Sequence, residues 1–566
     1  MKPEALTKIA LFTLSLILIN SCGAPSHEGM GPIGKQGMVV SAHPEATNIG
    51  LSILRKGGNA IDAAVAVQFA LAVCYPAAGN IAGGGFFVIR TSAQKVYTLD
   101  FREKAPLAAS KNMYIGPDGE VVKGLSTQTI LASGVPGTVD GMVKSHEKLG
   151  SLTWSAVIQP AIDLARKGFS ITRRQANDLN SIKKSLIERN TWKPVFIKDS
   201  IWKEGDLLVQ TELALTLERI RDSKREGFYS GPTADYIVQQ MLESGGLITH
   251  QDLQDYQSVW REPITGNYRN YTFYSMAPPS SGGVALKQLL GIISKFDLKS
   301  AGHNTVKSIH LMAEAEKRVY ADRAEYLGDP DFVAVPVNEL TDEKYLSKRA
   351  DEIKADKATP SDSIKAGVLG KAESMETTHF SIADRWGNAV SATTTLNGGY
   401  GNQIVVKGGG FFLNNEMDDF SSKPGSPNIY GLIGNYANAI EPGKRMLSCM
   451  TPTLITKNDK LYMVVGSPGG STIITSVFQT ILNVIDYGMS MQQAVSAKRY
   501  HHQWLPDLIQ YEPTAIDTVS VSGLLAMGHH LKKIGNIGRV DAILIWPDGT
   551  MEGGADPRGD DAAKGF

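Results

Sequence analysis

Two strand-like segments face each other across a short turn just past the middle of this 566-residue chain. The first runs from Thr377 to Ala383, the second ends at Thr395, and Asp-Arg-Trp-Gly-Asn lies between them. Such a turn predicts an antiparallel hairpin. If Ala383 pairs with Ala389, the same register sets Thr377 opposite Thr395, with Cβ atoms roughly 5 Å apart. Loop length alone leaves a slip of one residue open, and that slip would separate the two threonines.

The predicted secondary structure changes at Thr377 from mainly helical to mainly strand-like. Before it, apolar residues recur at three- and four-residue spacing, which predicts scaffold helices within 145–169, 211–228, 234–244 and 306–328. The stretch 351–376 has no aromatic residue and is rich in Lys, Asp, Glu and Ser, so we expect it to be exposed and mobile. Strand-like segments dominate after Thr377. The order of elements predicts a large α/β protein.

Composition and cysteine usage narrow the class of protein. The chain is 42% hydrophobic with a formal net charge of +0, so it has material for a large core and no basic patch for nucleic acid. Only Cys22, Cys74 and Cys449 occur, and no disulfide framework follows from them. Cys74 lies in an apolar helical run and is expected to be a small buried hydrophobe.

The first 22 residues have the layout of an export signal. Lys2 and Lys8 accompany an apolar run, Ile9 to Ile19, that is too short to cross a bilayer, and nothing amphipathic frames it as a core helix. The residues before Cys22 are similar to a bacterial lipobox, in which the cysteine is lipidated and becomes the mature N-terminus. Asn20 departs from the commonest pattern, so simple secretion stays open. We expect export to the periplasm or cell envelope, with or without a lipid anchor on Cys22.

An ordered set of segments resembles the γ-glutamyltransferases, which are N-terminal nucleophile hydrolases. The segments are AGNIAGGGFFVIR, DFREKAP, SGVPGTVDGM, PPSSGGVAL, TTHFSIAD, TTTLN, LNNEMDDFS, GSPGGS and RYHHQWLPD. The resemblance runs from about Gln36 to Phe566. It implies a four-layer α/β/β/α sandwich built from two chains cut from one precursor. The expected parts are an export signal (1–22), a linker (23–35), a large subunit (36–376) and a catalytic small subunit (377–566).

The resemblance also implies how the nucleophile is made. The precursor is expected to cleave itself between Glu376 and Thr377. The freed Thr377 then has a hydroxyl and an α-amine, and an α-amine titrates at about 7.7 to 8.0, so it can act as a base near neutral pH. Thr395 matches the threonine that holds the nucleophile's hydroxyl. Supporting strand roles are expected for Thr378, His379, Thr393 and Thr394.

The expected donor is glutathione or another γ-glutamyl compound, whose head presents an α-carboxylate and an α-ammonium. Arg102 matches the residue that binds the carboxylate, for which a guanidinium can form two parallel hydrogen bonds. The ammonium is assigned to Asn397, Glu416 and Asp419. Without the resemblance, a lone arginine and an acidic cluster are ordinary surface features. Asp418 is expected to be structural.

Ser448 and Cys449 match two hydroxyl residues that assist the substrate carboxylate. Cys449 departs from the usual serine, and since a thiol is a weak donor, simple packing is an equal alternative for it. Gly469 and Gly470 match the residues whose backbone N–H groups stabilise the oxyanion. A glycine-rich turn can also cradle phosphate, but the lysine of a P-loop is missing.

A long Gly-, Pro-, Ser- and Asn-rich loop over residues 421–439 resembles the family's active-site lid, with Tyr430 at the gate. His501 and His502 lack a third ligand at a useful spacing, so we expect packing or hydrogen-bonding roles and no metal site there. No organic cofactor is expected either.

The resemblance therefore implies an exported heterodimeric enzyme, made as a zymogen, that passes the γ-glutamyl group to water or to an amino acid or dipeptide. One alternative is a cephalosporin or glutaryl acylase, which needs no ammonium pocket, so Asn397, Glu416 and Asp419 argue against it. The other is a cell-envelope binding lipoprotein without the reaction. The retained threonines and glycines argue against that alternative.

Overall fold

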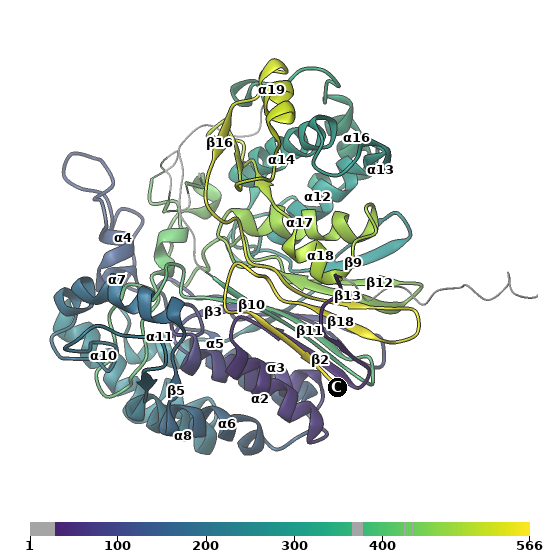
Figure 1. Ribbon diagram of the computed structural model, residues 1–566. Helices are drawn as coiled ribbons and strands as arrows, with labels where there is room; N and C mark the ends of the chain where they lie inside the picture. The colour runs from purple at the N-terminus through teal and green to yellow at the C-terminus, as the bar shows by residue number, and fades with distance from the viewer. Residues whose placement is uncertain (1–28, 365–376, 424–425, 427, 430, 433) are drawn as a thin grey trace, which may run out of the picture.

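The computed structural model describes residues 29–364, 377–423, 426, 428–429, 431–432 and 434–566. Its centre is a pair of stacked seven-stranded sheets (Figure 1). The first sheet has the order β19 (Ala562–Gly565), β2 (Gly37–Ser41), β10 (Thr378–Asp384), β11 (Ala389–Thr395), β3 (Gly84–Arg90), β4 (Val96–Asp100), β7 (Val259–Arg261). The second has the order β1 (Ile33–Gly34), β18 (Met551–Gly554), β17 (Asp541–Ile545), β13 (Lys460–Gly466), β12 (Thr453–Lys457), β9 (Tyr271–Ser275), β8 (Ile264–Tyr268). Both sheets draw strands from either side of Thr377.

Helices cover the outer face of each sheet (Figure 1). Over the first sheet lie α2 (Pro44–Arg55), α3 (Ala60–Cys74), α5 (Thr138–Leu149), α6 (Trp154–Lys167) and α8 (Thr211–Ser223). Over the second lie α12 (Gly282–Ile293), α14 (Val306–Tyr326), α17 (Thr472–Ile485) and α18 (Met491–Ser496). A third apolar core, which includes Val40, Val88, Leu454 and Ile543, fills the space between the sheets. The expected four-layer α/β/β/α arrangement is confirmed.

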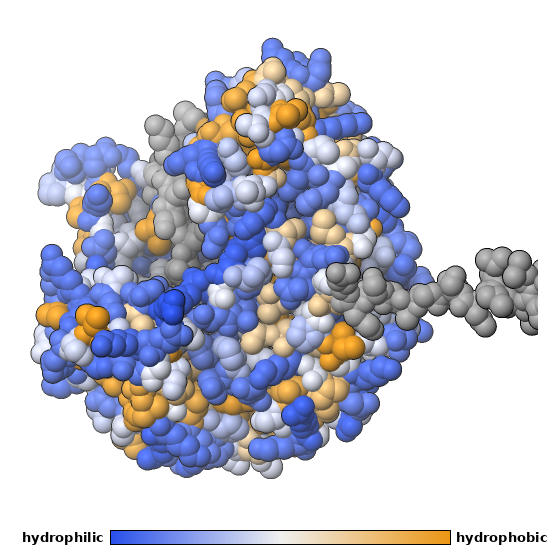
Figure 2. Space-filling model, viewed as in Figure 1, coloured by the Kyte–Doolittle hydropathy of each residue, from blue (hydrophilic) through white to orange (hydrophobic). Residues whose placement is uncertain are grey.

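The remaining helices and strands are short or peripheral. They are α4 (Leu125–Gln128), α7 (Arg173–Arg189), α9 (Glu226–Tyr229), α10 (Gly231–Ser244), α11 (His250–Asp255), α13 (Leu298–Ala301), α15 (Val337–Leu340), α16 (Glu343–Asp351), α19 (Thr518–Ala526), β5 (Phe169–Ser170), β6 (Leu207–Leu208), β14 (Tyr500–His501), β15 (Ile509–Tyr511) and β16 (Leu531–Lys533). Val519 and Leu525 of α19 expose 81% and 53% of their surface. Hydrophobic side chains gather at the top of Figure 2, where Figure 1 shows α19. Within the described part of the chain, no helix combines the length and apolar character needed to span a bilayer.

The central hairpin has the predicted register. Ala383 pairs with Ala389 and Thr378 with Thr394. Asp384 fixes the turn, because its Oδ1 accepts hydrogen bonds from the backbone N–H groups of Trp386 and Asn388 at 2.9 and 3.0 Å. Extending this register by one residue places Thr377 opposite Thr395. The alternative slip is excluded.

The predicted scaffold helices are present in all four ranges, and two ranges each contain a break. The 145–169 range holds the end of α5 and the whole of α6, and 211–228 holds α8 and most of α9. Asn59 caps the start of α3, since its side chain accepts from the N–H of Asp62 while the Asp62 carboxylate accepts from the N–H of Asn59. Every residue of α3 is buried, including Cys74.

The predicted exposed stretch is more firmly held than its composition indicated. Most residues of 351–364 are exposed, but the side chains of Ala358, Ser361 and Ile364 are buried. Ser361 is bound at both backbone polar groups, by the carboxylate of Asp507 at 2.9 Å and by the indole N–H of Trp504 at 2.8 Å. These partners lie far along the chain, which composition cannot reveal. Residues 365–376 lie outside the described residues.

Candidate active site

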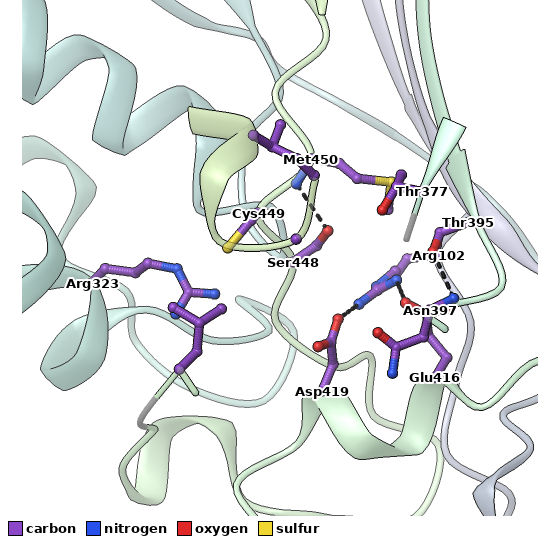
Figure 3. Close-up of a pocket in the computed structure, with 13 residues that line it drawn as sticks. Arg102, Arg323, Thr377, Thr395, Asn397, Glu416, Asp419, Ser448, Cys449 and Met450 are labelled. Carbon is purple, nitrogen blue, oxygen red and sulfur yellow. Dashed lines mark hydrogen bonds and ion pairs between the residues drawn. The ribbon is translucent and has the colours of Figure 1, made fainter. Parts of the chain in front are cut away.

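A cavity with about 280 Å³ of empty space lies at the end of the hairpin where β10 begins and β11 ends (Figure 3). Its walls combine segments that are far apart in the sequence. The predicted site residues that line it are Arg102, Thr377, Thr395, Asn397, Glu416, Asp419, Ser448, Cys449 and Gly470. Gly469 lines a neighbouring cavity that also includes Thr377. The fold thus gathers these predicted residues around one threonine.

Thr377 lies one residue before β10 and exposes 5% of its surface. Thr395 is the last residue of β11, and its hydroxyl oxygen accepts a 2.7 Å hydrogen bond from the backbone N–H of Asn397. Asn397 has φ +70°, a left-handed conformation that Asn tolerates better than most side chains. This hydrogen bond fixes the Thr395 hydroxyl in the cavity that Thr377 also lines.

The hydroxyls of Thr393 and Thr394 hold the strand in place, whereas that of Thr378 has no hydrogen-bond partner among the described residues. The Thr394 hydroxyl donates to the carbonyl of Gly84 at 2.9 Å. The imidazole of His379 bonds the hydroxyls of Thr393 at 2.8 Å and Ser381 at 3.1 Å. His379 is fully buried, and desolvation lowers its pKa to about 3, so the ring is neutral at ordinary pH. These contacts are the supporting ones predicted for such residues.

Arg102 is paired directly with the carboxylates predicted for the opposite charge. Its Nη1 donates to Glu416 and its Nη2 to Asp419, while Glu103 lies 3.4 Å from Nη1 (Figure 3). The Arg102 and Glu416 side chains are 0% and 1% exposed, and Asp419 is 11% exposed. The structure therefore joins the residue predicted to bind the carboxylate and the acidic residues predicted to bind the ammonium in one buried ionic cluster.

Burial governs the pKa values in this cluster. Desolvation raises the pKa of Glu416 well above its ordinary value against the opposing charge of Arg102, and it raises the pKa of Glu103 to about 7. Desolvation also raises the pKa of Asp419, again opposed by Arg102. In Arg102 the neighbouring carboxylates outweigh burial and raise the pKa further. Arg102 therefore stays charged, while burial disfavours the ionised form of each neighbouring carboxyl group.

The glycine-rich turn lies between β13 and α17. Gly469 has φ +138° and Gly470 has φ +51°, values that favour glycine. A Cβ on Gly469 would come within 2.6 Å of the Thr472 hydroxyl, which donates to the Gly469 carbonyl at 2.8 Å. The turn opens onto the N-terminus of α17, where helix dipole and backbone N–H groups favour negative charge. Thr377 lines both cavities that this turn borders.

Ser448 and Cys449 form another wall of the cavity together with Arg323 of α14, a residue that sequence reasoning placed only in a scaffold helix. Arg323 Nε donates to the Ser281 hydroxyl at 2.9 Å, and that hydroxyl donates to the Ser448 carbonyl at 2.6 Å. Burial raises the pKa of the Cys449 thiol, opposed by Arg323. A signal for Arg323 existed, because AEAEKRVYADRAEY has charged residues all around the helix and some of them must face inward.

The loop predicted as a lid touches the acidic turn. Asn428 Nδ2 donates to Asp419 at 2.9 Å, the N–H of Ile429 donates to Asp418 at 2.8 Å, and Leu432 lines the cavity. Asp418 also accepts from the Ser126 hydroxyl at 2.5 Å, which agrees with its predicted structural role. Burial raises the Asp418 pKa to about 6. Tyr430, Glu376 and Cys22 lie outside the described residues.

The histidine pair has the expected hydrogen bonds. His501 bonds the Thr475 hydroxyl at 2.9 Å and Gln503 at 3.0 Å, and His502 lies 3.1 Å from Asp507. Both rings are buried, and desolvation lowers the pKa of His501 to about 4. Their hydrogen bonds secure residues 501–507, the segment whose Trp504 and Asp507 bind the backbone of Ser361.

A separate polar cluster lies on α14, outside this cavity. His310, Glu314 and His529 bring their donor atoms within 4.8 Å of one another, a grouping that spacing along the chain did not reveal. Glu314 already pairs with Lys317 at 3.1 Å and Arg318 at 2.8 Å. The cluster is therefore part of a buried ion-pair network.

Two stacked antiparallel sheets between helical layers, with a buried threonine before a central strand at the wall of a charged cavity, define the N-terminal nucleophile hydrolase class. The gamma-glutamyltranspeptidase family model matches residues 46–566, and the chain belongs to this family. It is 46% identical over 536 residues to the glutathione hydrolase proenzyme of Escherichia coli strain K12. The alignment covers 94% of this chain and 92% of that protein.

Two solved structures are also similar. The gamma-glutamyltranspeptidase of Helicobacter pylori is 47% identical, with a TM-score of 0.56 over 57% of this chain and 94% of that chain. A cephalosporin acylase from Bacillus halodurans is 27% identical, with a TM-score of 0.82 over 97% of this chain and 98% of that chain. Because an acylase shares the whole architecture, the fold alone does not define the donor.

Proposed function

We propose that this protein is an autoprocessing γ-glutamyltransferase and glutathione hydrolase. The observation that carries the proposal is Thr377, buried at the start of β10, at the wall of a cavity whose charged lining residues are Arg102, Arg323, Glu416 and Asp419. Among the described residues, the ionisable side chains that line it are two arginines and two acids, and a γ-glutamyl head likewise carries one positive and one negative group. A glutaryl or other acyl group without the ammonium would leave a carboxylate unpaired, which is costly in a buried site.

The ion pairs of Arg102 can be exchanged for pairs with the donor. Arg102 is paired with Glu416 and Asp419. When the donor enters, its carboxylate takes hydrogen bonds from the guanidinium, and its ammonium donates to the acidic residues and Asn397. Ionic contacts are replaced by equivalent ones, so the buried charges stay compensated. This recognition places the γ-carbonyl next to Thr377.

Cleavage of the precursor between Glu376 and Thr377 releases the α-amine of Thr377. That amine takes the proton from the Thr377 hydroxyl, and Oγ1 attacks the γ-carbonyl. Backbone N–H groups at Gly469 and Gly470 stabilise the oxyanion, with support from the α17 N-terminus. The C–N bond breaks, the proton passes to the departing amine, and a γ-glutamyl ester remains on Thr377. Thr395 orients the reacting hydroxyl.

The ester is then resolved by water or by an amine. Water gives glutamate, and an amino acid or dipeptide gives a new γ-glutamyl amide. Either nucleophile loses its proton to the Thr377 α-amine, and the proton returns to Oγ1 when the ester breaks. No metal ligand or organic cofactor takes part in these steps.

The test is the intact mass of the purified protein, measured beside hydrolysis of a γ-glutamyl anilide. The wild type is expected to consist of two chains, produced by cleavage of the bond before Thr377, and to hydrolyse the anilide. Thr377→Ala should stay a single inactive chain, and Thr377→Ser, which keeps a hydroxyl, should still be cleaved. A wild type that is uncleaved and inactive contradicts the proposal. Cleavage of Thr377→Ala would show that the reaction is not autocatalytic.

We propose further that the enzyme is exported to the bacterial periplasm or cell envelope. Support comes from the sequence of residues 1–22 alone, where a short apolar run follows Lys8 and ends near Cys22. Metabolic labelling with a fatty acid tests the anchor, with Cys22→Ser as the control. Labelling that depends on Cys22 supports a lipoprotein, an unlabelled but secreted wild type supports simple export, and retention of the full precursor in the cytoplasm contradicts both.

A further inference from the structure

A second cavity also reaches the nucleophile. It contains about 550 Å³ of empty space, part of it open solvent, and its lining includes Tyr75, Arg174, Thr377 and Gly469. Among the described residues, Thr377 is the one member that lines both this cavity and the first cavity, which contains Arg102 and Asp419 and is called the γ-glutamyl cavity below. Gly470 lines the γ-glutamyl cavity and Gly469 the second one. The nucleophile and the oxyanion turn therefore separate two compartments.

Of the described residues that line the second cavity, three are arginines and none is an aspartate or glutamate. Two of the arginines are neutralised within the fold. Arg539 pairs with Asp561 at 2.9 Å and donates to the Tyr75 hydroxyl at 3.0 Å, and Arg558 pairs with Glu512 and Asp556. These buried ion pairs make a rigid wall.

The third arginine, Arg174 of α7, is the least compensated. The nearest carboxylate oxygen, on Asp178, is 3.9 Å from its Nε, and its Nη1 donates to the Arg558 carbonyl at 2.6 Å. The other nearby acid, Asp560, accepts from the Thr172 hydroxyl at 2.7 Å. The Arg174 side chain is 38% exposed, so an incoming ligand can reach it. A partly exposed guanidinium that is held through Nη1 and has only a long 3.9 Å contact with a carboxylate can pair with the carboxylate of a ligand.

We infer that this second cavity binds the amine that resolves the acyl-enzyme, and that Arg174 binds the carboxylate of that amine. The inference rests on the proposed γ-glutamyl transfer. The class of ligand is an amino acid or short peptide with a free amine and a free C-terminal carboxylate. Because the donor's leaving amine and the acceptor's attacking amine react at the same carbonyl in opposite directions, both occupy the same compartment. The leaving dipeptide of glutathione has this chemistry.

The chemical step balances in this arrangement. The acceptor nitrogen attacks the ester carbonyl while the γ-glutamyl head stays in the first cavity. The new C–N bond forms, the bond from the carbonyl to Thr377 Oγ1 breaks, and one amine proton passes through the Thr377 α-amine to Oγ1. Neither an oxidant nor a further reactant is needed. Water can enter the same open cavity without using Arg174.

The experiment compares two acceptors with one donor. Glycylglycine carries the carboxylate and glycylglycinamide does not, and the donor is a γ-glutamyl anilide. For Arg174→Ala we expect a five- to tenfold loss of kcat/KM for glycylglycine and little change for glycylglycinamide. Arg174→Lys should recover part of the loss. The ratio between acceptors within one preparation does not depend on how much enzyme is folded.

Arg173 provides the matched control. It precedes Arg174 on α7, pairs with Glu204 at 3.0 Å, has an 81% exposed side chain and does not line the cavity. Arg173→Ala should keep the wild-type ratio between the two acceptors. Equal losses for both acceptors in Arg174→Ala, or an unchanged ratio, would overturn the inference while donor hydrolysis stands. A wild type without donor hydrolysis would instead contradict the proposed function itself.

Discussion

Arg102 and Asp419, which are 317 residues apart in the sequence, are joined by a hydrogen bond from Nη2 to Oδ2 inside the active-site cavity. The bond links a residue predicted for the substrate carboxylate with one predicted for the ammonium. Unpaired buried charges would be unstable, so each partner compensates the other, and a zwitterionic donor can take over both contacts.

Asp419→Asn should therefore weaken recognition of the donor's ammonium more than recognition of the rest of the donor. We expect kcat/KM for a γ-glutamyl anilide to fall about 100-fold, because a charged hydrogen bond is lost, and that for a glutaryl anilide to fall far less. Steady-state kinetics on both substrates checks the ratio. Asn428→Ala, which removes the 2.9 Å loop contact with Asp419 and the 3.1 Å hydrogen bond from the Leu432 N–H to Asn428 Oδ1 but keeps the Asp419 carboxylate, should leave the ratio unchanged. Equal losses on both substrates would contradict the assignment.

Thr395→Val should slow both cleavage and turnover at nearly constant side-chain volume. The change removes the hydroxyl that accepts from Asn397, leaving that buried N–H without its acceptor and Thr377 without its orienting partner. We expect kcat to fall at least tenfold, and Thr395→Ser to retain most of the activity. Single-turnover acylation and the rate of precursor cleavage are the measurements. A valine variant as active as the serine variant would rule out the hydroxyl's role.

Gly469→Ala should damage the oxyanion turn. Its φ of +138° disfavours alanine, and the added Cβ would lie 2.6 Å from the Thr472 hydroxyl. Because one oxyanion donor contributes roughly 10²- to 10³-fold to kcat in known enzymes, we expect a loss of about that size with a small change in KM. Gly535→Ala is the control, since nothing lies within 4 Å of its Cβ. Near-normal kcat in Gly469→Ala would remove the turn from the mechanism.

Cys449→Ser tests whether position 449 touches the donor. Burial raises the thiol pKa, so the group is a neutral and weak donor, whereas a hydroxyl forms a stronger hydrogen bond. We expect the donor KM to fall two- to fivefold with little change in kcat. Cys74→Ser, buried in α3 away from the cavity, should leave KM unaltered. An unchanged KM in Cys449→Ser would assign Cys449 to packing alone.

His379 should make stability depend on pH. Desolvation lowers its pKa to about 3, against an ordinary value of 6.5, so between these values only the unfolded chain binds the proton. The contribution is complete above about pH 6.5 and is lost as pH falls toward 3, by up to about 1.4 kcal/mol per unit. Urea unfolding of the uncleaved Thr377→Ala chain at pH 7 and pH 5 should show a smaller loss of stability when His379→Asn is added. Equal losses would contradict this assignment.

Local sequence determined the centre of the fold. The turn at Asp384 predicted the hairpin and, with Ala383 paired to Ala389, the register that brings Thr377 to Thr395. The structure then excluded the slip that loop length had left open. The Asn59 cap and the apolar spacing of α14 were equally readable. The resemblance to a family then supplied roles that composition and spacing could not.

Only the tertiary structure decided how charges meet. Arg323 was readable as part of a helix, yet its place beside Cys449 depends on how α14 packs against a loop more than a hundred residues later. The pairing of Arg102 with Asp419 and the arginine-lined cavity at Arg174 arise in the same way. Such contacts join residues with no common period or local pattern, and their strength depends on burial that only the assembled layers create.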